Sequence, residues 1–176
     1  MALIQTVEPD EAEGKVKEIY DTMQKNAGTI PAPLQLASAS PRMLDTAWQS
    51  IQYFSGHPNL GFAVLSSIRY LVAQEYNYAF CTGFNRNMLK KQGLSDEDIE
   101  KMEKDPLQAP LDDKDRTIVA FVLKAIKSPD AIEKQDIDRL HDMGWIDSDI
   151  FDALSHGTNM IGSSILMKTF KMDQTC

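Results

Sequence analysis

The apolar residues of this chain recur at spacings of three and four positions, not two. Within residues 10–25, Val16, Ile19, Tyr20 and Met23 form one apolar stripe, the pattern of an amphipathic helix. Strict alternation of apolar and polar residues does not persist between turn residues anywhere in the chain, so strands are not predicted. The pattern predicts an all-α bundle of about seven to eight helices.

Turn and capping residues divide the chain into helical segments. Ser40 stands where an N-cap is expected, before Pro41 at the first helical position, and Ser95 caps a later acidic helix. Helices are predicted over residues 10–25, 41–54, about 60–80, 81–92, 94–105, 112–127, 131–143 and 147–170. With no low-complexity linker, we expect a single domain, described as a helical lead-in (1–58), a core (59–128) and C-terminal helices (129–176).

Charge and composition narrow the classes of function. With 176 residues and a formal net charge of −8, the chain is long enough to bury a core and is ill suited to binding nucleic acid or anionic lipid. Residues 60–80 are too polar to span a membrane, and the N-terminus has no signal-peptide pattern, so we expect a cytoplasmic protein. The two cysteines form no disulfide framework or zinc spacing, and phosphate-loop motifs are absent, so neither metal nor cofactor is expected.

Cys81 is the candidate chemical group, in the stretch AFCTGFN between two predicted helices. It is a buried small residue that fills the core, a reactive thiol, or part of the lining of a substrate pocket. If the preceding helix continues to the junction, Tyr70, Gln74 and Asn77 lead to Cys81 at spacings of four, three and four, as a polar stripe beside the thiol. All three interpretations stay open at this point.

Several segments around Cys81 resemble a known family. They are IRYLVAQEYNYAFCTGFNRNML, KQGLSDEDIEKM, LDDKDRTIVAFVLKAIKSPDAI and DRLHDMGWIDSDIFDAL, preceded by the lead-in VEPDEAEGKVKEIYDTMQKNAGTIPAPLQLASASPRMLDT. In order and spacing they resemble the carboxymuconolactone decarboxylase and alkylhydroperoxidase D (AhpD)-like family, in particular its longer, peroxidase-related branch. The resemblance covers almost the whole chain and implies an AhpD-like helical bundle.

The resemblance also implies a redox motif that this chain only partly retains. Redox members carry Cys-x-x-Cys-x-x-x-His, with a glutamate twelve residues before the first cysteine. Cys81 occupies the first position, but Phe84, Met88 and Arg69 occupy those of the second cysteine, the histidine and the glutamate. Phenylalanine cannot close a disulfide with Cys81, and methionine cannot relay a proton.

Other polar residues have two interpretations each. Asn85 and Arg86 are exposed polar residues or donors to an anion near the start of their helix. Arg69 is expected to be solvated or at an interface, and an inward position would demand a partner and mark a functional pocket. His156 lies in a helix rich in small residues, which favours tight packing or a subunit contact over chemistry.

The resemblance implies a peroxiredoxin-type antioxidant oxidoreductase, here with weak or lost thiol peroxidase activity because only Cys81 remains. Recovery of an oxidised Cys81 would need an external thiol or Cys176 as resolving thiol. The alternatives are a carboxymuconolactone decarboxylase-like acid–base lyase and a non-catalytic small-molecule-binding or assembly protein. Homo-oligomers (dimer, trimer or hexamer) are expected, with small residues around Gly157 and Gly162 suited to contacts between subunits.

Overall fold

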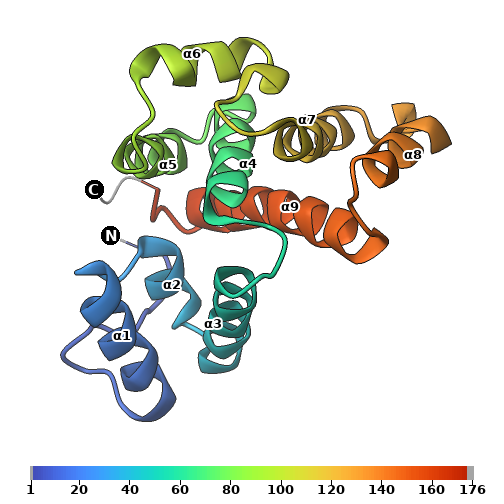
Figure 1. The fold of residues 1–176 in the computed structure, drawn as a ribbon. Coiled ribbons are helices and arrows are strands. Elements are labelled where there is room, and N and C mark those ends of the chain that lie inside the picture. The colour runs from blue at the N-terminus through green and yellow to red at the C-terminus, as the bar shows by residue number, and fades with distance from the viewer. Residues whose placement is uncertain (1, 174–176) are drawn as a thin grey trace. The chain divides into compact units, whose positions relative to one another are not determined.

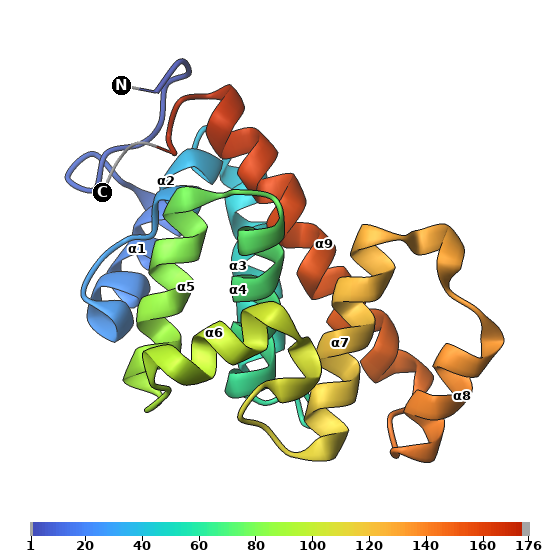
Figure 2. The ribbon, with the colours of Figure 1, turned by 90° about the horizontal axis from the view of Figure 1, so that it is seen from above.

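The protein is helical throughout the part that the structure describes. The computed structural model describes residues 2–173, apart from the side chain of Ala27 (Figures 1 and 2). In this range the α-helices are α1 (Gly14–Ala27), α2 (Ala32–Ala37), α3 (Pro41–Ser55), α4 (Phe62–Glu75), α5 (Ala79–Lys91), α6 (Asp96–Lys104), α7 (Asp113–Lys127), α8 (Lys134–Asp142) and α9 (Asp147–Thr169), with short 3-10 helices η1 (Pro106–Gln108) and η2 (Pro129–Ala131). The predicted all-α class is confirmed, with nine α-helices among the described residues instead of seven or eight.

The chain forms two compact units. One comprises the described residues of Met1–His57 and Ser163–Cys176, and the other is Pro58–Gly162. Helix α9 supplies residues to both of them. Within residues 2–173 no helix combines the length and apolar character needed to cross a membrane.

The first unit is built on the packing of α3 against α1 and α2. Apolar side chains from the three helices and the preceding segment form its core: Ala12, Val16, Ile19, Tyr20, Leu34 and Leu44. The Tyr20 hydroxyl donates to the Val7 carbonyl (3.0 Å), and the Val7 N–H donates to Ser38 Oγ (2.8 Å). These bonds satisfy buried polar groups and fasten the N-terminal segment to α1 and α2.

The second unit is organised around α4, which packs against α5 and α7 (Figures 1 and 2). Nine of the fourteen residues of α4 are buried: Val64, Leu65, Ser66, Ser67, Ile68, Tyr70, Leu71, Val72 and Ala73. A helix buried on most sides has no solvated polar face, which explains why its sequence shows little amphipathic periodicity. The polar groups that α4 does carry must therefore find partners inside the protein.

The helix predicted over residues 60–80 is in fact interrupted. Helix α4 ends at Glu75, and Asn77 has a left-handed backbone (φ 52°). The Asn77 N–H donates to the Gln74 carbonyl (3.1 Å) and the Tyr78 N–H to the Ala73 carbonyl (2.9 Å). This pair of bonds is the Schellman termination, in which asparagine is the usual substitute for glycine.

Glycine at position 157 permits the close packing of α9 within the second unit. A Cβ atom there would lie 2.8 Å from Val122 Cγ1 and Ile126 Cδ1 of α7 and 3.4 Å from Ile68 Cγ2 of α4. A Cβ at Gly162 would meet nothing within 4 Å. The small residue at 157 is therefore required by packing inside one chain.

The contrast between these two glycines gives a stability prediction. Gly157→Ala should lower the free energy of unfolding by about 1 to 3 kcal/mol, because buried side chains must shift to admit the methyl group. Gly162→Ala, the matched control, should leave it unchanged or raise it by up to about 1 kcal/mol, because alanine is the better helix former. Urea unfolding followed by circular dichroism measures both, and equal effects would contradict the packing described for Gly157.

Candidate functional site

Cys81 lies in the first turn of α5, just after the turn that ends α4. It is the third residue of the helix, and its side chain is 7% exposed. Ala73 and Tyr78 are buried with it, and Tyr76, Phe80 and Met160 pack against this cluster. The rings of Tyr76 and Tyr78 stack at 5.8 Å between centroids, so the thiol lies in mainly aromatic surroundings.

The positions that follow Cys81 along α5 carry no redox chemistry. Phe84, one turn further, is 45% exposed, and Met88 is half-buried. Neither side chain can form a disulfide or exchange a proton. Cys176 lies outside the described residues, so its proposed role as a resolving thiol stays a prediction.

The polar groups nearest to this turn form a cluster around Arg69 of α4. Arg69 Nε donates to Asn85 Oδ1 (3.0 Å), Nη2 donates to Ser66 Oγ (3.2 Å), and Nη1 lies 3.1 Å from His156 Nε2. Asn85, which is 1% exposed, donates through Nδ2 to the Cys81 carbonyl (2.8 Å). The cluster thus joins α4, α5 and α9 and ends at the backbone of Cys81.

The hydrogen bond from Arg69 fixes the protonation state of His156. A guanidinium has only donors, so His156 Nε2 must be the acceptor and the ring's proton must be on Nδ1. Burial, together with the positive charge of Arg69, lowers the pKa of His156 to about 3, although a hydrogen bond from the ring to the backbone of Leu65 acts in the opposite direction. His156 is therefore a neutral imidazole at physiological pH.

Arg69 is more buried than the sequence predicted. The sequence favoured a solvated or interface role, but the side chain is half-buried, and burial lowers its pKa to about 10. It stays charged at neutral pH. Within Pro58–Gly162, the described residues place no carboxylate at ion-pair distance from it, and its three hydrogen bonds all go to neutral acceptors.

The predicted polar stripe beside the thiol does not form, because α4 ends before the junction. Gln74 and Asn77 are exposed. Tyr70 is fully buried, but its hydroxyl donates to Glu103 and accepts from Arg86 Nη1 (3.0 Å). The structure therefore does not bring these three residues together as a stripe beside the thiol, and their role as pocket lining stays a prediction.

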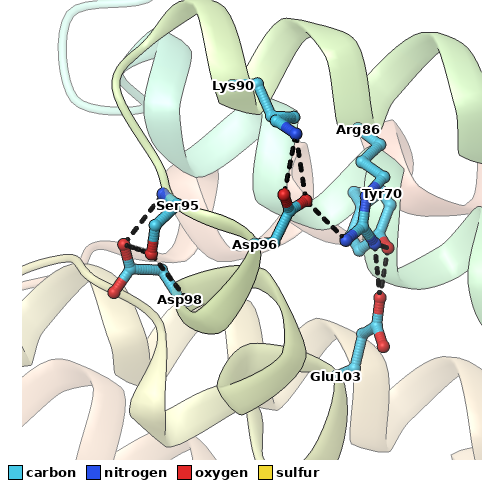
Figure 3. A network of polar contacts seen from close by, with 7 residues as sticks. All are labelled: Tyr70, Arg86, Lys90, Ser95, Asp96, Asp98 and Glu103. Atoms are coloured by element: carbon cyan, nitrogen blue, oxygen red, sulfur yellow. Dashed lines mark hydrogen bonds and ion pairs between the residues drawn. The ribbon is translucent and has the colours of Figure 1, made fainter.

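Tyr70 belongs to a second polar network, which fastens α6 to α4 and α5 (Figure 3). Arg86 bonds Glu103 (3.3 Å) and Asp96 (2.9 Å), and Lys90 also bonds Asp96 (2.9 Å). Burial first, and then the neighbouring Glu103, raise the pKa of Tyr70 to about 12. Each charge is matched by an opposite one, so this network holds the three helices together.

Among the described residues, Cys81 belongs neither to a group that could hold a metal ion nor to the lining of the surface hollow in the second unit. The described residues contain no group of three or more His, Cys, Asp and Glu side chains able to hold a metal ion. A surface hollow of about 440 Å³ lies between η1, α7 and α8, and its lining includes none of the residues predicted for the site. The Arg69 cluster was missed from the sequence, although a lone cation in the apolar run FAVLSSIRYLVA was a signal for it.

Comparison with known proteins supports the fold. No family model matches the sequence, and no curated protein matches it. The chain is similar to the crystal structure of an uncharacterized peroxidase-related protein from Silicibacter sp. TM1040, with a TM-score of 0.77, 17% identity, and coverage of 97% of this chain and 93% of that one. It is also similar to an alkylhydroperoxidase AhpD core structure, an uncharacterized peroxidase-related protein from Ralstonia eutropha JMP134, with a TM-score of 0.81, 15% identity, and coverage of 97% and 90%.

At these identities the likeness establishes the fold alone. The predicted fold class, an AhpD-like all-α bundle, is confirmed. Residues of the site must be judged by their own geometry.

The neutral state of His156 gives a prediction about acid stability. Its pKa is lower in the folded protein (about 3) than in the unfolded chain (about 6.5), so the unfolded state takes up the proton first as the pH falls. The stabilising effect of a neutral His156 is complete above pH 6.5 and is lost as the pH falls toward 3. Between pH 7.5 and 5, His156 should contribute a loss of about 1 to 2 kcal/mol in the free energy of unfolding.

His156→Asn removes the titrating ring and should flatten this part of the pH profile. His141→Asn is the matched control, because His141 is an exposed histidine that bonds Asp147 (2.8 Å). Urea unfolding at a series of pH values measures the difference. A His156→Asn profile that runs parallel to the unaltered protein would contradict the assignment.

Proposed function

We propose that this protein is an alkylhydroperoxidase-like protein that has lost the two-cysteine peroxidase cycle and retains, at most, slow one-thiol chemistry at Cys81. The observation that carries the proposal is the first turn of α5, where Cys81 is buried and the residue one turn further is an exposed phenylalanine. The fold shared with peroxidase-related proteins supports the general class. The absence of a sulfur at position 84 supports the loss of the internal disulfide step.

The one-thiol reaction follows from the chemistry of the group. Cys81 first loses its proton, and the thiolate attacks the terminal oxygen of a hydroperoxide. The O–O bond breaks, the leaving alkoxide takes up one proton, which balances the one released by the thiol, and departs as the alcohol, and the sulfur becomes a sulfenic acid. An external thiol then displaces water to give a mixed disulfide, and a second molecule of that thiol releases Cys81. The helix N-terminus favours an anionic sulfur, while an exposed fraction of 7% restricts the approach of peroxide.

The acid–base lyase is the less well supported alternative. A lyase of this family would use an imidazole at position 88, where this chain has methionine. His156 is a poor replacement, because Nε2, the nitrogen that would take a proton, already accepts a hydrogen bond from Arg69. A non-catalytic binding role is the second candidate, and the Arg69 cluster favours it. As further proposals, the protein is a cytoplasmic homo-oligomer that binds neither nucleic acid nor membrane.

Peroxide consumption tests the proposal directly. In a Cys176→Ser background, incubation with tert-butyl hydroperoxide should convert Cys81 once to a sulfenic acid, and turnover should continue slowly only when dithiothreitol is present. Trapping with dimedone and peptide mass spectrometry identify the modified residue and separate it from oxidised methionines. Cys81→Ser should abolish both the adduct and the thiol-dependent turnover.

Two results would overturn the one-thiol assignment. One is a Cys81–Cys176 disulfide in the peroxide-treated unaltered protein, which would restore a two-cysteine cycle. The other is undiminished turnover by Cys81→Ser.

A further inference from the structure

Among the described residues, Arg69 has no carboxylate at ion-pair distance, although the protein has an excess of carboxylates. The chain has 26 acidic and 18 basic residues. Arg86 and Arg116, in the same unit, each form ion pairs with aspartate or glutamate. Arg69 instead bonds an amide, a hydroxyl and a neutral imidazole. A half-buried cation with only neutral partners lacks the group that would best compensate its desolvation.

We propose that Arg69, positioned by Asn85 and His156, binds the carboxylate of a small organic acid. The proposal does not depend on peroxide chemistry at Cys81.

The donors of the guanidinium support this assignment. Of its five N–H groups, Nε uses one, and Nη1 and Nη2 use one each in the bonds already described. One hydrogen therefore remains on each terminal nitrogen. Each of these two hydrogens can be donated to a carboxylate oxygen.

The neighbours hold Arg69 in place before any ligand arrives. Asn85 Nδ2 bonds the Cys81 carbonyl, which fixes the amide so that Oδ1 faces Arg69. Ser66 Oγ donates to the Phe62 carbonyl (2.6 Å) and so presents its lone pairs to Nη2. A site whose side chains are already ordered loses little conformational entropy on binding.

The charge and surroundings favour a singly charged organic anion over phosphate. His156 stays neutral, so Arg69 provides the only positive charge in the cluster. The ring of Phe62 lies 5.9 Å from the guanidinium carbon and is 52% exposed, which provides an apolar surface beside the charge. An acid with an aromatic or branched apolar group fits both features.

Binding of benzoate, with benzamide as a neutral analogue of the same shape, tests the proposal. The 176-residue chain is titrated with each compound, and binding is measured by isothermal calorimetry and by the NMR signal of Arg69 Nε–H. Benzoate should show saturable binding and benzamide none. The affinity should fall at least about tenfold in Arg69→Met, because charged hydrogen bonds are lost. Arg116→Met, which alters a half-buried arginine that already has Asp113 as partner, should bind as the unaltered protein does.

A second variant keeps the test decisive if Arg69→Met does not fold. Asn85→Asp places a carboxylate where Oδ1 already bonds Arg69, so an internal anion should compete with benzoate and weaken its binding at least about tenfold. Cys81→Ser should leave benzoate binding intact, which separates this proposal from the one-thiol chemistry. Equal binding of benzoate and benzamide, unchanged affinity in Asn85→Asp, or tighter binding of inorganic phosphate than of benzoate would overturn the assignment.

Discussion

The hydrogen bonds of Arg69 are the constraint on which the candidate site depends. The packing of α4 leaves this side chain half-buried, and a guanidinium cannot be buried without acceptors. Those acceptors come from three separate places in the sequence, Ser66 on the same helix, Asn85 on α5 and His156 on α9. The tautomer of His156 and the orientation of the Asn85 amide both follow from this one charge.

The thiol of Cys81 and the cation of Arg69 have different surroundings. Cys81 lies among aromatic rings, and its backbone carbonyl accepts a hydrogen bond from Asn85 of the polar cluster. Arg69 is a cation held by neutral acceptors, one of which, Asn85, also bonds that carbonyl. A cation at this position favours bound anions over the transfer of protons from a thiol.

The helical fold could be predicted from the sequence, whereas the Arg69 cluster could not, for identifiable physical reasons. Helix periodicity and capping are local, so the helix starting at Pro41 and the Ser95 cap of α6 were both correct. The break at Asn77 was missed because apolar residues continue on both sides, although asparagine is a common terminator in the left-handed conformation. The Arg69 cluster could not be assembled from spacing, because its partner His156 is 87 residues away and meets it only through tertiary packing.

Gly157 connects the packing of the core with the position of His156 in the Arg69 cluster. A single hydrogen in place of a side chain sets how near this part of α9 lies to α4 and α7. His156, which precedes Gly157, accepts a hydrogen bond from Arg69. The distance between α9 and α4 therefore also determines whether the imidazole can contact Arg69. A larger side chain at position 157 would therefore shift His156 as well as the apolar neighbours from α4 and α7, and the electrostatic environment of Arg69 would change with it.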